Sequence, residues 1–225
     1  FGPIDGHSVG ELVELLTHVK DLDGPIVIHA LTQKGKGYSF AEEDAFTYHG
    51  VSPFEPETGN FVKKSGSGIQ QKSYSKVFAE KLEDLMEADS QVVALSAAMM
   101  SGTGIIGLHE KYPERVLDVG IAEGHAVTCA AGLAAEGSKP FGTIYSTFLQ
   151  RALDHIIHDV AIQKLPGRFA LDRAGLVGVD GPTHHGCFDL TYLRMIPNLV
   201  VLVPADGSEV RLLAQFALEH DGSMA

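Results

Sequence analysis

The chain has 225 residues, of which 44% are hydrophobic and 20% are charged. This balance is typical of a folded globular protein, and no apolar run approaches the ~18 to 20 residues that a membrane helix needs. With 17 Lys and Arg against 29 Asp and Glu, the formal net charge is −12. We therefore expect neither a nucleic-acid partner, which requires a basic surface, nor a membrane, and any anionic ligand must be held by a few local cations and backbone N–H groups.

The two cysteines, Cys129 and Cys187, form no CxxC motif. They are too few for a disulfide scaffold and fit a reducing, cytoplasmic compartment, so we expect both to be buried as small hydrophobic residues. Residues 1–10 have neither the basic start nor the apolar core of a signal peptide. Both ends of the sequence are abrupt, with no closing element after residue 221, which indicates a fragment of a longer protein.

The first part of the chain shows two ordered segments. Apolar residues recur at helical spacing over 9–19, and the run over 25–31 (PIVIHAL) predicts a short buried strand. Residues 50–72 are rich in Pro, Gly and Ser with little periodicity, as is typical of a linker between domains.

From residue 73 onward, helical and strand-like segments alternate. Strands joined through helices of this length run parallel, and apolar runs such as VVALS and FGTIY suit a sheet that is covered on both faces. The sequence therefore predicts an α/β fold, a parallel sheet flanked by helices. The predicted helices are 73–88, 104–111, 122–135, 147–164 and 208–220, with a short helical turn near 189–195; the predicted strands are 92–96, 116–119, 141–145, 168–171 and 199–203.

Ligands of such a sheet bind in the loops that follow the carboxyl ends of its strands. Glu123 lies in one of these loops, where a strand gives way to a small, apolar helix. A buried carboxyl there is suited to general acid/base work. The alternative is a residue that only stabilises the first helical turn through the helix dipole, and the residues alone leave both open.

Two other loops carry candidate ligand groups. Arg151 and Arg173 lie at the same predicted edge and could bind a phosphate through their planar guanidinium groups, although a surface ion pair is the ordinary role of a lone arginine. The loop 180–186 (DGPTHHG) is held by Pro and flanking Gly, as binding loops often are. His155 and His158 have no third ligand at metal-binding spacing, so no metal site is predicted.

Several motifs in this order resemble the 1-deoxy-D-xylulose-5-phosphate synthase family, thiamine-diphosphate enzymes of the transketolase type. The resemblance covers nearly the whole chain. The motifs that carry it are FGPIDGH at 1–7, KGKGY at 34–38, DVGIAEGHA at 118–126, IYSTFLQRA at 144–152, HDVAIQKLP at 158–166 and DRAGLVGVDGPTHHGCFDL at 172–190.

The resemblance implies condensation of pyruvate with D-glyceraldehyde 3-phosphate to 1-deoxy-D-xylulose 5-phosphate and CO2, the first step of non-mevalonate isoprenoid biosynthesis and a source of thiamine precursor. It implies that residues 1–49 are the tail of a diphosphate-binding domain, 50–72 a linker and 73–225 the pyrimidine-binding domain. The third domain and the segment that binds diphosphate and Mg²⁺ would lie outside this chain, so the fragment alone should be inactive. The family also implies a homodimer in the cytoplasm, or in the plastid of a plant.

Site residues follow from the same resemblance. It implies that Glu123 bonds the pyrimidine ring of the cofactor, that Phe148 stacks on that ring, and that Ile121 and Lys34 also contact the cofactor. The resemblance further implies a group of substrate-binding residues, in which His184 and His49 are also catalytic: Tyr145, Arg151, Arg173, Asp180, His184 and His49.

The sequence departs from the family pattern at Gly124, Leu153, His155 and Gly167. A glycine beside Glu123 removes a side chain that would help to fix this loop, so we expect a less constrained carboxylate and weakened activity. Two alternatives stay open: another thiamine enzyme of the transketolase type, and a non-catalytic paralogue that keeps the fold.

Overall fold

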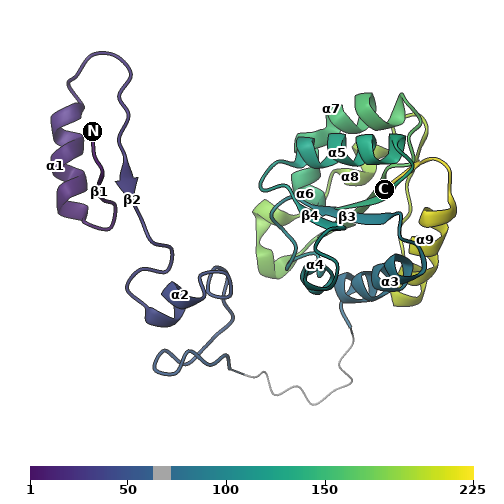
Figure 1. The fold of residues 1–225 in the computed structure, drawn as a ribbon, viewed down its shortest axis with the longest axis horizontal. Coiled ribbons are helices and arrows are strands. Elements are labelled where there is room, and N and C mark those ends of the chain that lie inside the picture. The colour runs from purple at the N-terminus through teal and green to yellow at the C-terminus, as the bar shows by residue number, and fades with distance from the viewer. Residues whose placement is uncertain (63–71) are drawn as a thin grey trace. The chain divides into compact units, whose positions relative to one another are not determined.

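The computed structural model describes residues 1–62 and 72–225, and it divides into two compact units, Phe1–Ile69 and Gln70–Ala225 (Figure 1). Each unit is described by itself. In the described part of the chain, no helix has the length and apolar character needed to cross a membrane.

The first unit begins with two short parallel strands, β1 (Ile4–Asp5) and β2 (Ala30–Leu31), connected through helix α1 (Val9–Val19). Helix α1 has the predicted bounds, because its apolar spacing starts directly after Ser8, whose hydroxyl oxygen accepts a hydrogen bond from the Glu11 N–H. The prediction of a buried strand over 25–31 is wrong in its length and its burial. Only two residues are in the strand and both are exposed, because β2 pairs with β1 alone in a two-stranded sheet.

The segment that follows folds around aromatic rings. Helix α2 (Ser39–Glu43) begins after Tyr38, and the rings of Tyr38, Tyr48 and Phe54 lie 5.4 to 5.6 Å apart between centroids. Phe54 forms an antiparallel bridge with Phe61. Residues 54–61 of the predicted linker therefore pack back onto residues 38–48. Residues 63–71 of the linker lie outside the described residues.

The second unit is built on a six-stranded parallel sheet in the order β4-β3-β5-β6-β8-β7. The strands are β3 (Val92–Ser96), β4 (Val116–Asp118), β5 (Lys139–Tyr145), β6 (Arg168–Asp172), β7 (Leu199–Val200) and β8 (Ser223–Met224). The predicted α/β class with a parallel sheet flanked by helices is confirmed. Figure 1 shows α5 and α7 on one face of the sheet and α3, α4 and α9 on the other.

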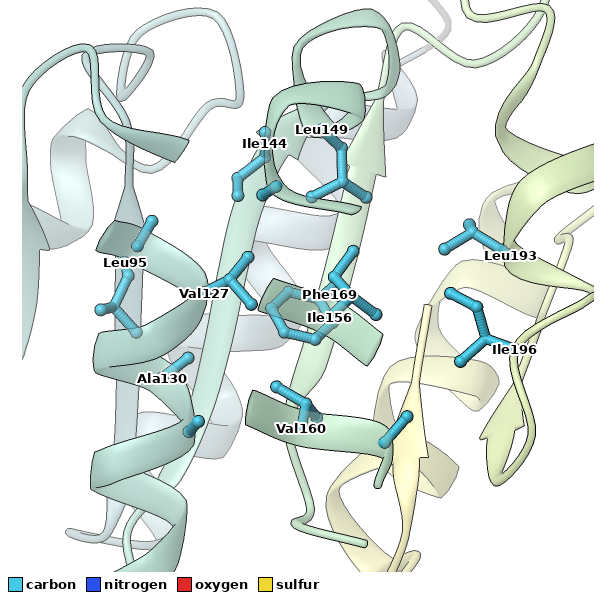
Figure 2. Packing of buried hydrophobic residues seen from close by; sticks show 14 of the residues in the cluster. Leu95, Val127, Ala130, Ile144, Leu149, Ile156, Val160, Phe169, Leu193 and Ile196 are labelled. Atoms are coloured by element: carbon cyan, nitrogen blue, oxygen red, sulfur yellow. The ribbon is translucent and has the colours of Figure 1, made fainter. Parts of the chain in front are cut away.

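The helices that cover the sheet are α3 (Tyr74–Ala88), α4 (Ile106–Lys111), α5 (Glu123–Ala135), α6 (Ser146–Leu149), α7 (Leu153–His155), α8 (Asp189–Leu193) and α9 (Gly207–Glu219). On one face, residues such as Leu95, Val127, Ile144 and Phe169 form a continuous buried cluster (Figure 2). A second cluster fills the other face between α3, α4, α9 and the sheet. Because both faces are covered, β5 is almost completely buried. Residues that could reach a ligand therefore lie at the ends of the strands.

Three predictions for this unit are wrong in detail. The single helix expected over 147–164 is instead α6, a 3₁₀ turn at Gln150–Ala152, α7 and a π-helical turn at Ile156–Ala161, in which the Ile162 N–H donates to Ile157 O, five residues back. The expectation of no element after residue 221 is wrong, since β8 lies between β6 and β7. Cys187 is exposed and Cys129 is half-buried, so neither is fully buried.

Candidate active site

The candidate site lies where β4, β3, β5 and β6 end. The register pairs Ser96 with Asp118 across β3 and β4, and Tyr145 with Asp172 across β5 and β6. The loops after these four strands therefore leave the sheet at one edge, and most of the predicted site residues are on them.

Glu123 is the first residue of α5, and its carboxylate is buried, with 4% of the side-chain surface exposed. Its Oε1 accepts a hydrogen bond of 2.6 Å from Nη1 of Arg151, a side chain that is 56% exposed. Across the described residues, no backbone N–H donates to the carboxylate and its Oε2 accepts no hydrogen bond. The geometry thus favours a carboxylate kept for a ligand over one that only caps the helix.

Arg151 links this carboxylate to a pair of stacked aromatic rings. Tyr145, the last residue of β5, stacks on Phe148 of α6 with a centroid distance of 5.6 Å and an interplanar angle of 10°. The ring of His184 approaches Phe148 edge-on at 5.4 Å. The Arg151 guanidinium carbon lies 5.0 Å from the Phe148 ring centroid, which is within the range of a cation–π contact.

The backbone of the loop after β3 comes very close to the Tyr145 hydroxyl. A Cβ atom at position 102 would overlap the Tyr145 hydroxyl, so the loop after β3 can come this near only with Gly102. Burial raises the pKa of Tyr145 above its ordinary value, which keeps the hydroxyl protonated and able to donate a hydrogen bond at neutral pH.

Arg173 follows β6 and adopts a left-handed backbone conformation with φ of 60°. Its Nε donates to Asp180 Oδ2 and its Nη1 to Asp172 Oδ1, both at 2.7 Å, and Nη1 also reaches Gly102 O at 3.3 Å. Burial alone would lower the pKa of Arg173, but the hydrogen bonds to Asp180 and Asp172 outweigh burial and raise it. Within the described residues, Nη2 donates no hydrogen bond, so one end of this guanidinium is available to a ligand.

A cavity of about 620 Å³ lies next to Arg173. Its polar lining comes from the start of α3 and from the loop after β3, including Ser73, Lys76, Ser101 and Gly102. Its size and its position at the carboxyl edge of the sheet suit a small phosphorylated substrate.

The structure brings together seven of the predicted residues: Glu123, Tyr145, Phe148, Arg151, Arg173, Asp180 and His184. Ile121 lies in the loop before α5 and is 81% exposed. His49 and Lys34 are exposed residues of the first unit, and their roles stay predictions. In the part of the chain that the structure describes, no group of three or more His, Cys, Asp or Glu could hold a metal ion.

The space beside Gly124 is filled from another segment, while the expectation that this glycine leaves Glu123 less constrained stays a prediction. A Cβ atom at position 124 would lie 2.7 Å from Cε1 of His155, so the imidazole already fills the space of the missing side chain. The Nδ1 atom of His155 is buried there and has no hydrogen-bond partner in the described chain. The two departures Gly124 and His155 therefore form one packed contact.

Sequence reasoning did not assign three further groups. Asp172 was detectable, because a carboxylate at a strand end lies beside Arg173. Ser146 and Asp189, the first residues of α6 and α8, form a buried hydrogen bond of 2.8 Å. Their separation of 43 residues leaves no local signal in the sequence.

The pyrimidine-binding domain of transketolase matches residues 70–225 of the chain. The chain belongs to this transketolase pyrimidine-binding domain family. A second family, 1-deoxy-D-xylulose-5-phosphate synthase, matches residues 1–32.

Relatives and solved structures agree with the family. The chain is 56% identical over all 225 residues to the 1-deoxy-D-xylulose-5-phosphate synthase of Anaeromyxobacter sp. (strain Fw109-5) and spans 35% of its length. It is 53% identical to the synthase of Aquifex aeolicus over 93% of this chain and 33% of that protein. The solved structure of transketolase from Leishmania mexicana matches 67% of this chain, which corresponds to 24% of the transketolase chain. The TM-score is 0.61 and the sequence identity is 25%. The chain thus spans about a third of the length of the curated relatives it matches.

Proposed function

We propose that this transketolase-type chain is the central part of a 1-deoxy-D-xylulose-5-phosphate synthase, which condenses pyruvate with D-glyceraldehyde 3-phosphate and releases CO2, at the start of non-mevalonate isoprenoid biosynthesis. The identity of more than half over the full chain to bacterial synthases supports this proposal. The observation that carries it is the buried Glu123 carboxylate, which shares the Arg151 guanidinium with the ring of Phe148.

These residues fit the aminopyrimidine ring of thiamine diphosphate. Glu123 Oε2 is free of hydrogen bonds among the described residues and can share a proton with a ring nitrogen, while Phe148 offers an aromatic face for the same ring. When bound there, thiamine diphosphate would supply the nucleophilic carbon and the electron sink that decarboxylation of pyruvate needs.

The remaining side chains would bind and orient the acceptor aldehyde. Arg173 can donate its free Nη2 edge to the phosphate, while Asp180 and Asp172 hold the guanidinium in place. The protonated Tyr145 hydroxyl can donate to an acceptor oxygen. His184 bonds Thr183 Oγ1 through Nδ1 at 2.9 Å, and its Nε2 has no partner in the described chain, so it can exchange a proton with the sugar oxygens.

The family resemblance adds further parts of the proposal. We include in it that Ile121 and Lys34 contact the cofactor, that His49 is catalytic, and that Arg151 makes a second contact with the phosphate. The proposal also includes a homodimer and a cytoplasmic location. The diphosphate and Mg²⁺ would bind to other parts of the longer protein.

Replacing Glu123 by Gln in the full-length protein tests the function. We expect turnover of [1-¹³C]pyruvate with glyceraldehyde 3-phosphate, followed by ¹³CO2 and product formation, to fall by about 10² to 10⁴, the usual contribution of a positioned acid or base. Glu136→Gln is the matched control, an exposed carboxylate at the end of the same helix, and it should retain activity.

Three results would count against the proposal. Turnover of the Glu123→Gln variant within a few-fold of the unchanged protein would remove the role of this carboxylate. Activity with a ketose phosphate donor and no CO2 release would favour another transketolase-type enzyme. Absence of thiamine diphosphate binding in calorimetry, with and without Mg²⁺, would favour a non-catalytic paralogue.

A further inference from the structure

The guanidinium of Arg151 has two partners in the candidate site. Its Nη1 donates to Oε1 of the buried Glu123 carboxylate at 2.6 Å, and its central carbon lies 5.0 Å from the Phe148 ring centroid. A planar, N–H-bearing group therefore already lies between a carboxylate and an aromatic ring.

Guanidinium and aminopyrimidine share the chemistry that these two partners recognise. Both are flat, both carry N–H groups in the plane, and both can rest a face on an aromatic ring while an edge donates to a carboxylate. We propose that Glu123 and Phe148 form a cradle for planar N–H groups, that Arg151 occupies it when the cofactor is absent, and that the aminopyrimidine displaces Arg151. This inference rests on the proposed function for the identity of the incoming ring.

The local fold allows such an exchange. Arg151 lies in the 3₁₀ turn at Gln150–Ala152, between Leu149 and Ala152, which are both fully buried and fix the backbone. Its side chain, in contrast, is 56% exposed and can turn into solvent without opening the core. In the described chain the guanidinium makes no other hydrogen bond or ion pair that would hold it.

The exchange also makes the cradle selective. A buried carboxylate that loses its only cationic partner is strongly unfavourable unless a new donor replaces it. A flat ring without an N–H group would cover Phe148 but leave Glu123 unpaired. We therefore expect only rings that bring a donor to displace Arg151.

The test compares ligand binding to the 225-residue chain and to its Arg151→Ala variant by NMR titration. The probes are methylguanidinium, 4-amino-2-methylpyrimidine and, as a flat ring without N–H groups, toluene. We expect the first two to bind at least about fivefold more tightly to the variant, with shifts at the start of α5 and at the Phe148 ring, and toluene to gain less. Arg194→Ala, which removes an exposed arginine directly after α8, is the matched control and should change none of these affinities.

Two results would overturn the inference: equal affinities of the unchanged chain and Arg151→Ala for both N–H probes, or an equal gain for toluene. A gain for methylguanidinium without one for the aminopyrimidine would support occupancy by Arg151 and count against the thiamine function, so the two failures are distinguishable. Arg151→Lys is a second variant in case Arg151→Ala does not fold. It keeps a charge beside Glu123 but no flat group over Phe148, and it should also bind the aminopyrimidine more tightly than the unchanged chain.

Discussion

The contact between Gly124 and His155 predicts that substitutions at the two positions are coupled. Gly124 is the second residue of α5, and a Cβ atom there would come within 2.7 Å of His155 Cε1 and 3.0 Å of its Nε2. Gly124→Ala therefore forces the imidazole out of a space in which its Nδ1 atom is already buried.

Two opposing terms set the magnitude. Alanine is favoured over glycine in a helix by up to about 1 kcal/mol, whereas overpacking a well-filled site costs about 1 to 3 kcal/mol. Gly124→Ala alone should thus lower the free energy of unfolding by about 0 to 2 kcal/mol. In a His155→Ala background the clash is gone, and Gly124→Ala should raise the free energy of unfolding by about 0.5 to 1 kcal/mol. The predicted coupling is about 1 to 3 kcal/mol, above the ~0.3 to 0.5 kcal/mol within which independent sites add.

Urea unfolding followed by far-UV circular dichroism measures this cycle. Gly132→Ala is the matched control on the same helix, because no atom lies within 4 Å of its added Cβ, and it should stabilise both backgrounds equally. The reasoning is refuted if Gly124→Ala stabilises the unchanged chain as much as Gly132→Ala does, or if the coupling falls below about 0.5 kcal/mol.

Three further predictions concern the second unit. Burial raises the pKa of Tyr192 to about 12, and its buried hydroxyl has no partner in the described chain, so Tyr192→Phe should raise the free energy of unfolding in urea by about 1 kcal/mol; a loss would contradict this. A hydrogen bond from Lys139 lowers the pKa of the Asp89 carboxyl in the folded chain. The Lys139–Asp89 pair therefore stabilises the folded state above the unfolded pKa of ~3.9, and this contribution is lost as the pH falls through the lower folded pKa. Lys139→Met should therefore cost less than about 1 kcal/mol at pH 6 and nothing at pH 2 in unfolding curves, and a loss independent of pH would be inconsistent with this. The buried guanidinium of Arg168 donates to carbonyl oxygens at the end of α9. Arg168→Met should therefore lower the thermal midpoint and reduce the free energy of unfolding by about 2 to 4 kcal/mol. A loss smaller in size than the gain expected from Tyr192→Phe would argue against this.

The elements that could be predicted from the sequence are those whose signal is local. The bounds of β3 follow from an apolar run that is buried on both faces, and those of α1 and α3 from Ser8 and Ser73 at their N-caps. The break after Leu149, where α6 is followed by a 3₁₀ turn, has no Pro or Gly at it, so the local sequence does not predict it. Strand β8 is two residues long, too short for any periodicity, and forms only because β6 and β7 are in place.

The same distinction applies to the site. Rules for parallel sheets placed Glu123, Tyr145 and Arg173 at one edge, because position at a strand end can be read from the sequence. Hydrogen-bond partners cannot be read this way. The exposure of the Arg151 side chain, its choice of Glu123 and the filling of the Gly124 space by His155 depend on packing between segments about 30 residues apart.

The two arginines of the site differ in a way that couples cofactor binding to acceptor binding under the proposed function. Arg173 is held by Asp172 and Asp180 and still has a free Nη2 edge among the described residues, so it can receive a phosphate as it stands. Arg151 cannot bind a phosphate while it donates to Glu123. Displacement by the aminopyrimidine would release Arg151 and add a second cation for the acceptor phosphate. Cofactor and acceptor then each bind more tightly in the presence of the other, by the same factor, because coupling between two sites is reciprocal.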